Sequence, residues 1–410
     1  MRDASIKADD LLMSKAPTTA LNPVIWLLAL GTFAIGTDVF VVSGVLSLIA
    51  QDLSTSLESA GLTVTAYALT YALAAPLIVP LTATLNQRRV CISALAMFAV
   101  GNVLCAPAQS CELLMAARAI AGIAAALYTS TAYALATSLA PANRKGAALS
   151  AVALGLTASA VFGVPIGAAI GHAIGWRATF WLVATLSGAA VFALSYRRFA
   201  NHSNLNTTRL TYAARFAPLI RPTVLLSLLP SLLWNTANLT SYTYLGAMLA
   251  ERHDPQTVIF LFFVYGVGGL IGSQLGGRLL DRFGVTIPLA FCLAIAAINQ
   301  ALMEISATST ITIALALALW SITGWATFAP QQARLINLAP QNSALLIALN
   351  HSVIYIGFAI GAAIGGAAIG RGIDVSQLHW ITTGLLVAAL LIFLLGVKRK
   401  IAEPSYDAIT

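Results

Sequence analysis

The side chains best placed to do chemistry are ionisable groups inside long apolar runs: Asp38, Arg118 and His351. Asp38 is the acidic residue that lies deepest in such a run, Pro23 to Ala50. A carboxylate buried in a membrane is unfavourable unless it faces a partner or a water-filled cavity, so by default it marks a proton or substrate pathway. His351 titrates near physiological pH, which makes it a candidate second proton site or substrate contact. A neutral histidine satisfied by its neighbours is the alternative for His351.

The composition indicates which elements must position these groups. Hydrophobic residues make up 59% of the 410-residue chain, charged residues only 9%, and the mean hydropathy is +0.86. Soluble domains carry about 25% charged residues, so the composition is that of an integral membrane protein. About 20 apolar residues cross a bilayer as a helix. We therefore expect twelve spans: Pro23–Ala50, Gly61–Ala83, Val90–Ala108, Leu113–Leu139, Gly146–Ile170, Trp176–Tyr196, Thr223–Leu249, Val258–Leu280, Val285–Ile305, Ile311–Phe328, Leu345–Ile369 and Leu378–Val397.

These spans account for nearly all of the chain and leave no room for a soluble catalytic domain, so we do not expect an enzyme. The phosphate-binding pattern Gly-x-x-x-x-Gly-Lys, which a nucleotide-driven pump would need, does not occur in the sequence. The cysteines Cys91, Cys105, Cys111 and Cys292 lack metal-ligand spacing. We expect no cofactor and no metal, with a proton gradient as the energy source.

Basic residues gather in the loops that follow even-numbered spans. Short loops rich in Lys and Arg stay in the cytoplasm, so we expect both termini there, in the cytoplasmic (inner) membrane of a bacterium. The net charge of +8 then reports topology, because the basic residues are not collected on one nucleic-acid-binding face. The loop residues that carry this signal are Arg88, Arg89, Arg144, Lys145, Arg278, Arg282, Arg334 and Lys398.

This orientation brings Asp38 and Arg118 to a common depth. With a rise of about 1.5 Å per residue, Asp38 lies about 22 Å from the cytoplasmic start of the first span, and Arg118 about 9 Å from the periplasmic start of the fourth. In a hydrocarbon core of about 30 Å these depths nearly coincide, so the two side chains can pair. A nearby guanidinium favours the ionised carboxylate, and a dry environment disfavours it. Moving Arg118 would then switch Asp38 between releasing and holding a proton. A permanent pair that only fixes helix packing is the alternative.

The chain is organised as two related halves. The turn after the second span, Leu85 to Arg89, corresponds to the turn after the eighth, Leu280 to Gly284, and a hydrophilic connector separates the halves. Two six-span bundles of this kind form a central site that each side of the membrane reaches in turn. We expect an all-α membrane protein with these divisions: an N-terminal tail (1–22), a six-helix bundle (23–196), a cytoplasmic linker (197–222), a second six-helix bundle (223–397) and a C-terminal tail (398–410).

The stretch from Gly277 to Gly284, which reads GRLLDRFG, resembles the loop signature of the major facilitator superfamily. The resemblance implies a pseudo-symmetric twelve-helix fold in which Asp281, together with Gly277, Arg282 and Gly284, forms a latch that the transport cycle releases. The first-half copy departs from the signature, because Asn86 stands where the family has an acid and only Arg88 and Arg89 remain. An Asn there can still cap a helix, so we expect a weaker contact that does not depend on charge.

The first span, Gly36 to Leu53, resembles the drug/proton antiporter branch of this superfamily, which includes bacterial drug, sugar, arabinose and purine efflux proteins. Arg118 resembles the arginine that the family ties to proton coupling. The Gly163-Val164-Pro165-x-Gly167 stretch resembles the antiporter signature of the fifth span. Small residues that merely let helices pack closely are the alternative reading of this stretch.

Neutral polar and aromatic residues are the candidates for substrate contacts. The seventh span is unusually polar, so we expect hydrogen bonds and ring faces, rather than charges, to hold the substrate. Each of these residues alone is more often an interhelical packing group than a ligand contact. The candidates are Tyr67, Tyr71, Trp234, Asn235, Asn238, Tyr242, Gln331, Asn350 and Tyr355.

The sequence thus predicts a monomeric secondary transporter that exports a small molecule, such as a drug, a sugar or a related metabolite, in exchange for protons. A proton symporter or facilitator that imports a sugar or nucleoside has the same fold and is the alternative. Its partners would be the substrate, protons and the lipid bilayer, with no nucleic acid.

Overall fold

The computed structural model describes residues 21–82, 85–197, 222–338 and 343–402, and within them every regular element is a helix. The expected all-α fold is therefore confirmed. The expected linker 197–222 and the tails 1–22 and 398–410 lie largely outside the described residues.

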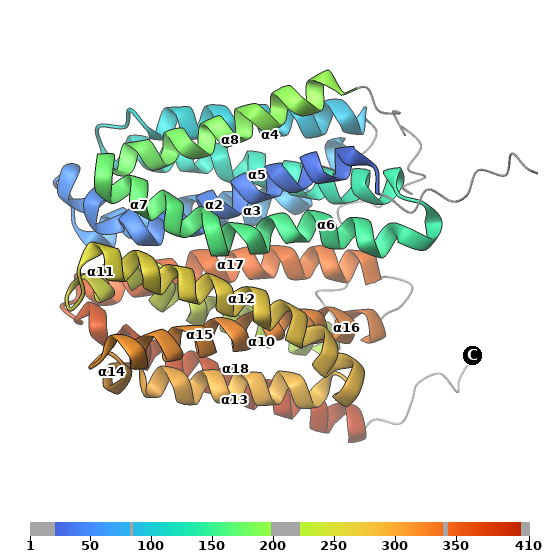
Figure 1. Cartoon of the computed structure of the whole chain (residues 1–410). Helices are drawn as coiled ribbons and strands as arrows, with labels where there is room; N and C mark the ends of the chain where they lie inside the picture. The colour runs from blue at the N-terminus through green and yellow to red at the C-terminus, as the bar shows by residue number, and fades with distance from the viewer. Residues whose placement is uncertain (1–20, 83–84, 198–221, 339–342, 403–410) are drawn as a thin grey trace, which may run out of the picture.

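The first half of the chain forms six spans (Figure 1). The fifth span is built from three consecutive pieces, because a π-helical turn interrupts it before Pro165. The helices are α2 (Pro23–Asp52), α3 (Leu57–Thr82), α4 (Gln87–Cys105), α5 (Cys111–Leu139), α6 (Lys145–Ala158), the π-turn η2 (Ser159–Gly163), α7 (Val164–Ile174) and α8 (Trp176–Tyr196), with a short 3₁₀ turn, η1 (Ala142–Arg144), before α6.

The second half forms the other six spans, and two of them end differently from the prediction. The seventh breaks at Thr243 and Tyr244, and the tenth continues in a second helix that carries Arg334, so Arg334 lies within a helix and not in a loop. The elements are α10 (Pro222–Tyr242), α11 (Leu245–Ala250), α12 (Pro255–Phe283), α13 (Thr286–Ala301), α14 (Met303–Ser306), α15 (Thr310–Ala326), α16 (Phe328–Leu338), α17 (Ser343–Gly370), the 3₁₀ turn η5 (Val375–Gln377) and α18 (Leu378–Ala402).

Ten of these spans are long and apolar enough to cross a membrane. The other two are α13, which is shorter, and α10, whose second half carries Asn235, Thr236 and Asn238 among its apolar residues. Polar groups inside a span are tolerated where they face the interior of the bundle. Together these helices account for the twelve predicted spans.

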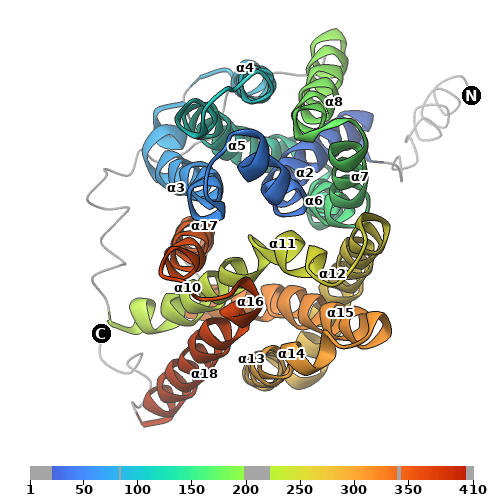
Figure 2. The same cartoon turned by 90° about the vertical axis from the view of Figure 1, so that its left-hand side faces the viewer.

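The helices form two groups (Figure 2): α2 to α8 lie on one side and α10 to α18 on the other. Within the first group α3 and α4 pack against α5, and α2 packs against α6. Within the second, α10 packs against α17 and α18, and α12 against α15. The groups meet where α3 contacts α17, where α2 contacts α11, and where α12 contacts η2 and α7.

The molecule has two distinct ends along its helix axes. We call the end where α8 finishes and α10 begins the linker end, and the end where α2 finishes and α3 begins the distal end (Figure 1). At the distal end the groups are tied together. Ser43 donates a hydrogen bond to the Tyr242 carbonyl, and Thr65 Oγ1 donates to the Ala359 carbonyl at 3.3 Å.

Tyr244, at the break between α10 and α11, closes the distal end further. Its hydroxyl donates to the Ala362 carbonyl at 2.8 Å, and its ring lies against Gly365 of α17 and Gly61 of α3. A Cβ atom on Gly61 would collide with the Tyr244 hydroxyl. The side chain therefore bridges the two groups through a space that only glycine leaves open.

Candidate functional site

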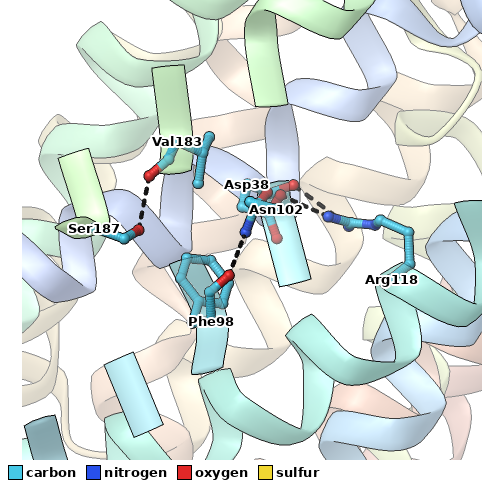
Figure 3. A network of polar contacts seen from close by, with 6 residues as sticks. All are labelled: Asp38, Phe98, Asn102, Arg118, Val183 and Ser187. Atoms are coloured by element: carbon cyan, nitrogen blue, oxygen red, sulfur yellow. Dashed lines mark hydrogen bonds and ion pairs between the residues drawn. The ribbon is translucent and has the colours of Figure 1, made fainter. Parts of the chain in front are cut away.

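Asp38 and Arg118 form a buried ion pair between α2 and α5 (Figure 3). Arg118 Nη1 donates to Asp38 Oδ1 at 2.6 Å, Nη2 lies 3.4 Å from the Asp38 carbonyl oxygen, and both residues have no exposed surface. Asp38 Oδ2 and Arg118 Nε have no hydrogen-bond partner among the described residues. Pairing of this kind is what makes buried charges tolerable, but this pair leaves hydrogen-bonding capacity unused.

A row of glycines holds α2 close to the fifth span and so fixes the position of Asp38. A Cβ on Gly163 would collide with Thr37, and one on Gly167 would lie 2.5 Å from Val41 Cγ2. Thr37 precedes Asp38 and Val41 follows it by about one helical turn, so Gly163 and Gly167 fix the stretch of α2 that carries Asp38. The π-turn η2 ends at Gly163, and Pro165 follows in the first turn of α7. Small residues permit such close helix contacts.

Aromatic rings connect the ion pair to the interface between the two groups. The Arg118 guanidinium lies 4.3 Å from the centre of the Tyr67 ring, within the range of a cation–π contact. The Tyr67 ring centre lies 6.5 Å from that of Tyr71 on the same helix. Tyr71 in turn stacks on Tyr355 of α17, with 3.5 Å between ring centres. A displacement of Arg118 can therefore be transmitted to a contact between the two halves.

Asn102 of α4 is a component that the sequence analysis missed. The residue is fully buried, its Nδ2 donates to the Phe98 carbonyl at 3.1 Å, and its Oδ1 has no partner among the described residues. Figure 3 shows Asn102 and its bond to Phe98 in the same view as the ion pair. In the sequence, Asn102 could have been noticed because it is an amide among the apolar residues of the third span.

A cavity of about 270 Å³ lies between the two groups, and helices of both groups line it. Among the described residues, its lining contains no Asp, Glu, Lys or Arg, and His351 is its one imidazole. Phe328 packs beside His351, with 6.1 Å between ring centres. The lining includes eight of the nine predicted substrate contacts: Tyr71, Trp234, Asn235, Asn238, Tyr242, Gln331, Asn350 and Tyr355.

Tyr67 is not among the lining residues, so the cavity does not include the ninth predicted contact. It lies one helical turn from Tyr71 and is buried under the Arg118 guanidinium instead. Asp38 and Arg118 also lie off the cavity wall, whereas His351 lies on it, so the three residues expected to couple protons are not brought together.

The amide side chains on the cavity wall differ in which hydrogen-bonding atoms they leave free for a ligand. Asn235 Nδ2 donates to the Ser231 carbonyl at 2.7 Å, and Gln331 Nε2 donates to the Ser227 carbonyl at 3.0 Å. Asn350 is buried, and its Oδ1 has no partner among the described residues. Asn350 therefore provides a hydrogen-bond acceptor for a molecule in the cavity.

Thr129 and Tyr133 of α5 and Trp325 near the end of α15 also line the cavity. The sequence analysis missed these residues because it did not determine which faces of α5 and α15 turn toward the other half. Their spacing of four on α5 places Thr129 and Tyr133 on one face, which is the signal that was available.

The first-half loop motif caps helices. The Asn86 side chain accepts a hydrogen bond from the Arg89 backbone N–H at 3.1 Å and so caps α4, as the sequence analysis allowed. Arg88 Nη2 donates to the carbonyl oxygens of Ser195 and Arg197 at 3.0 and 3.1 Å. A guanidinium at the carboxyl end of α8 satisfies carbonyl groups that the helix leaves unpaired.

The second-half loop motif is open in this conformation. Asp281 and Arg282 are exposed, and no ion pair joins Asp281 to another described residue. Gly284 caps α12 with a φ of 69°, in the region that favours glycine, and its N–H donates to the Leu280 carbonyl at 2.9 Å. Nothing lies within 4 Å of a Cβ built on Gly277.

Most of the cavity residues lie in the middle or linker-end parts of their helices, such as Thr32 and Ile35 in α2, Phe393 in α18 and Asn350 to Phe358 in α17. In α10 they run from Pro230 to Tyr242, which is the distal end of that helix. The inter-group contacts of Ser43, Gly61 and Thr65 lie at or beyond this distal limit of the cavity, since Ser43 bonds to the Tyr242 carbonyl. The chain is therefore closed at the distal end, with its cavity on the linker side.

A multi-span helical protein with a central cavity between two six-helix groups and a buried ion pair has the architecture of a secondary transporter. The family model "Major Facilitator Superfamily" matches residues 28–362 and 237–408, and the chain belongs to that superfamily. The resemblance seen in the sequence is thus confirmed.

Individual relatives agree with this assignment. The chain is 30% identical to the inner membrane transport protein YdhP of Escherichia coli strain K12, over 93% of this chain and 97% of that protein. It is 29% identical to the probable sugar efflux transporter of Mannheimia succiniciproducens, over 83% of this chain and 85% of that protein. The crystal structure of the nucleoside transporter NupG superimposes with a TM-score of 0.71 at 14% identity, covering 92% of this chain and all of that one, which supports the fold alone.

Proposed function

We propose that this transporter exports a small, uncharged or weakly basic molecule in exchange for protons, with Asp38 as the proton carrier. The buried Asp38–Arg118 pair carries the proposal, because it is an ionisable group without solvent access and with an unused carboxylate oxygen. Intramembrane carboxylates of this kind are typical of proton pathways. The similarity to a probable sugar efflux transporter of Mannheimia succiniciproducens supports outward transport.

In this mechanism the ion pair changes the contact between the two halves. A proton on Asp38 neutralises the carboxylate and releases Arg118, whose guanidinium then changes its contact with Tyr67. Tyr67 packs near Tyr71, and Tyr71 stacks across the interface on Tyr355. Proton binding at Asp38 and substrate binding against Tyr71 and Tyr355 thus act on the same stack of rings.

The cavity lining favours an uncharged substrate with a flat ring. Because the described residues of the wall include no Asp, Glu, Lys or Arg, a charged group would lose hydration there without gaining an ionic partner from them. Aromatic side chains from both halves can stack on a ring, and the Asn350 acceptor can orient a hydroxyl or amide donor.

We further propose that both termini are cytoplasmic, so that the cavity faces the cytoplasm in this conformation. The basic residues of the even-numbered loops support this orientation. Cargo would then bind from inside, and a proton would enter from outside after the distal end opens. The membrane potential contributes about 2.3 kcal/mol per charge per 100 mV.

The first test is the direction of transport in cells that express the chain. We expect expression to lower the accumulation of at least one probe from a panel of an uncharged aromatic antibiotic, a pentose and a purine nucleoside. A protonophore should restore accumulation to the level of cells without the protein, since export draws on the proton gradient. Higher accumulation on expression would contradict export and support the import alternative.

A further inference from the structure

A second polar cluster lies at the distal end of the C-terminal half, apart from the central cavity. It contains His379 at the start of α18 and Gln300 near the end of α13, which are 2% and 0% exposed. Neither ring nitrogen of His379 and neither side-chain atom of Gln300 has a hydrogen-bond partner among the described residues. Four buried polar atoms without partners in one place are unusual in a folded protein.

An acidic side chain stands next to this cluster. Glu304 of α14 places its Oε2 3.8 Å from His379 Nε2, and the Glu304 side chain is 59% exposed. The cluster therefore joins a buried imidazole to a carboxylate that water on the distal side can reach.

Two small cavities adjoin these residues and share Met248 and Met303 in their walls. One, of about 20 Å³, is lined by Glu304, and the other, of about 10 Å³, is lined by Gln300 and His379. Each is about the size that holds one water molecule. A water bonded to Gln300 and His379 would satisfy polar atoms that the protein leaves unpaired.

From these contacts we infer that His379, Glu304 and Gln300 form a proton-binding site that opens to the distal side, with water as its second ligand. A proton on His379 turns its contact with Glu304 into an ion pair between α18 and α14. A metal ion is a poor occupant, because no group of three or more His, Cys, Asp or Glu side chains within the described residues could hold one.

The other charged groups around the site lie in the loops at the distal end. Glu251, Arg252 and His253, which follow α11, line the same small cavity as Glu304, and Asp374 precedes η5. Burial raises the pKa of Glu251, Asp374 raises it further, and Arg252 opposes both. The faces of α10, α13 and α15 that meet the site contribute neutral side chains, among them Ser241, Gln300 and Trp320.

The site lies next to α11, the segment that closes the distal end. Leu245 and Met248 of α11 line the small cavities. The same helix packs against α2, where a Cβ on Gly246 would lie 3.2 Å from Gly44 Cα. An ion pair between His379 of α18 and Glu304 of α14 would hold these two helices together next to α11. Acid on the distal side would therefore stabilise the conformation in which the distal end is closed.

Hydrogen–deuterium exchange of α11 in the purified full-length protein tests this site without any substrate, so its failure is distinct from a failure of proton-coupled export. At about pH 5, on the acid side of the imidazole titration, we expect wild-type α11 to exchange more slowly than His379→Gln or Glu304→Gln. The difference should reach up to about fivefold, the value of a partly exposed ion pair. At about pH 8 the three proteins should exchange alike.

His253→Gln is the matched control, because His253 lines the neighbouring cavity but does not face Gln300. This variant should keep the wild-type response to pH. The site is refuted if wild type and both variants exchange alike at the two pH values, or if only His253→Gln loses the response. Glu304→Gln changes a largely exposed side chain, so it decides the question even if His379→Gln does not fold.

Discussion

At the scale of single residues, the ion pair lies in a polar site whose hydrogen-bonding groups are only partly satisfied. Asp38 Oδ2, Arg118 Nε and Asn102 Oδ1 are all buried without partners among the described residues. A site built only for stability would pair these atoms or replace them with apolar groups, because buried charges contribute little net stability. Spare hydrogen-bonding capacity beside Asp38 suits a group that must hold a proton in one state and release it in another.

Asn102 tests this interpretation. We propose that Asn102 Oδ1, which has no partner among the described residues, accepts a hydrogen bond from Arg118 once Asp38 is protonated. We therefore expect Asn102→Leu to reduce proton-driven transport by about tenfold or more, since a hydrogen bond to a charged group contributes about 1.5–3 kcal/mol. Exchange of substrate across the membrane without a proton gradient should change much less. Ser93→Ala on the same helix is the control, because the Ser93 hydroxyl donates to the Val90 carbonyl of its own turn. Equal loss of both activities in Asn102→Leu would indicate a packing role.

The sequence predicted the ion pair well, because depth follows from helix rise and orientation from the basic loops. It did not separate Tyr67 from Tyr71, since residues four apart share one helix face. The structure shows that one ring turns to Arg118 and the other to the cavity. Asn102 was also missed, because a lone amide gives no sign of which neighbour it faces.

At the scale of helices, glycine positions decide how close α2 approaches the fifth span. Gly155, Gly163, Gly167 and Gly171 all contact α2 where a Cβ would collide. The sequence showed the glycines and Pro165 but not the π-turn or the break at Tyr244, because such irregularities depend on tertiary packing. The span count and the paired halves were readable, since they follow from hydropathy and loop charge.

The pair Gly167→Ala and Gly188→Ala tests the role of this contact. A methyl group on Gly167 lies 2.5 Å from Val41 Cγ2, so we expect a loss of about 1–3 kcal/mol of stability from overpacking. Gly188 lies in α8 with nothing within 4 Å of its Cβ position, so Gly188→Ala should leave the protein unchanged or slightly more stable.

Thermal unfolding in detergent, together with transport, measures both variants. Gly167→Ala should unfold at a lower temperature and transport more slowly. If both variants behave like wild type, the close contact between α2 and α7 is not needed to position Asp38.

At the scale of the whole molecule, the structure represents one state of a cycle. The two halves meet at the distal end through Ser43, Tyr244 and Thr65, and the cavity lies toward the linker end. The exposed Asp281 fits this state, because a latch at the linker end would form when the cavity closes there. The latch itself stays a prediction for the opposite conformation. No local pattern could reveal which state the chain adopts, since both states use the same helices.

The central claim is that Asp38 carries the proton that drives transport. The most direct measurement is proton movement across proteoliposomes when a transported probe is added, read with a pH-sensitive dye trapped inside. Asp52→Asn is the matched control, because Asp52 pairs with Arg177 at the exposed distal end. We predict that wild type and Asp52→Asn move protons against the probe, and that Asp38→Asn moves none while still binding the probe. Unchanged proton movement in Asp38→Asn would contradict the account.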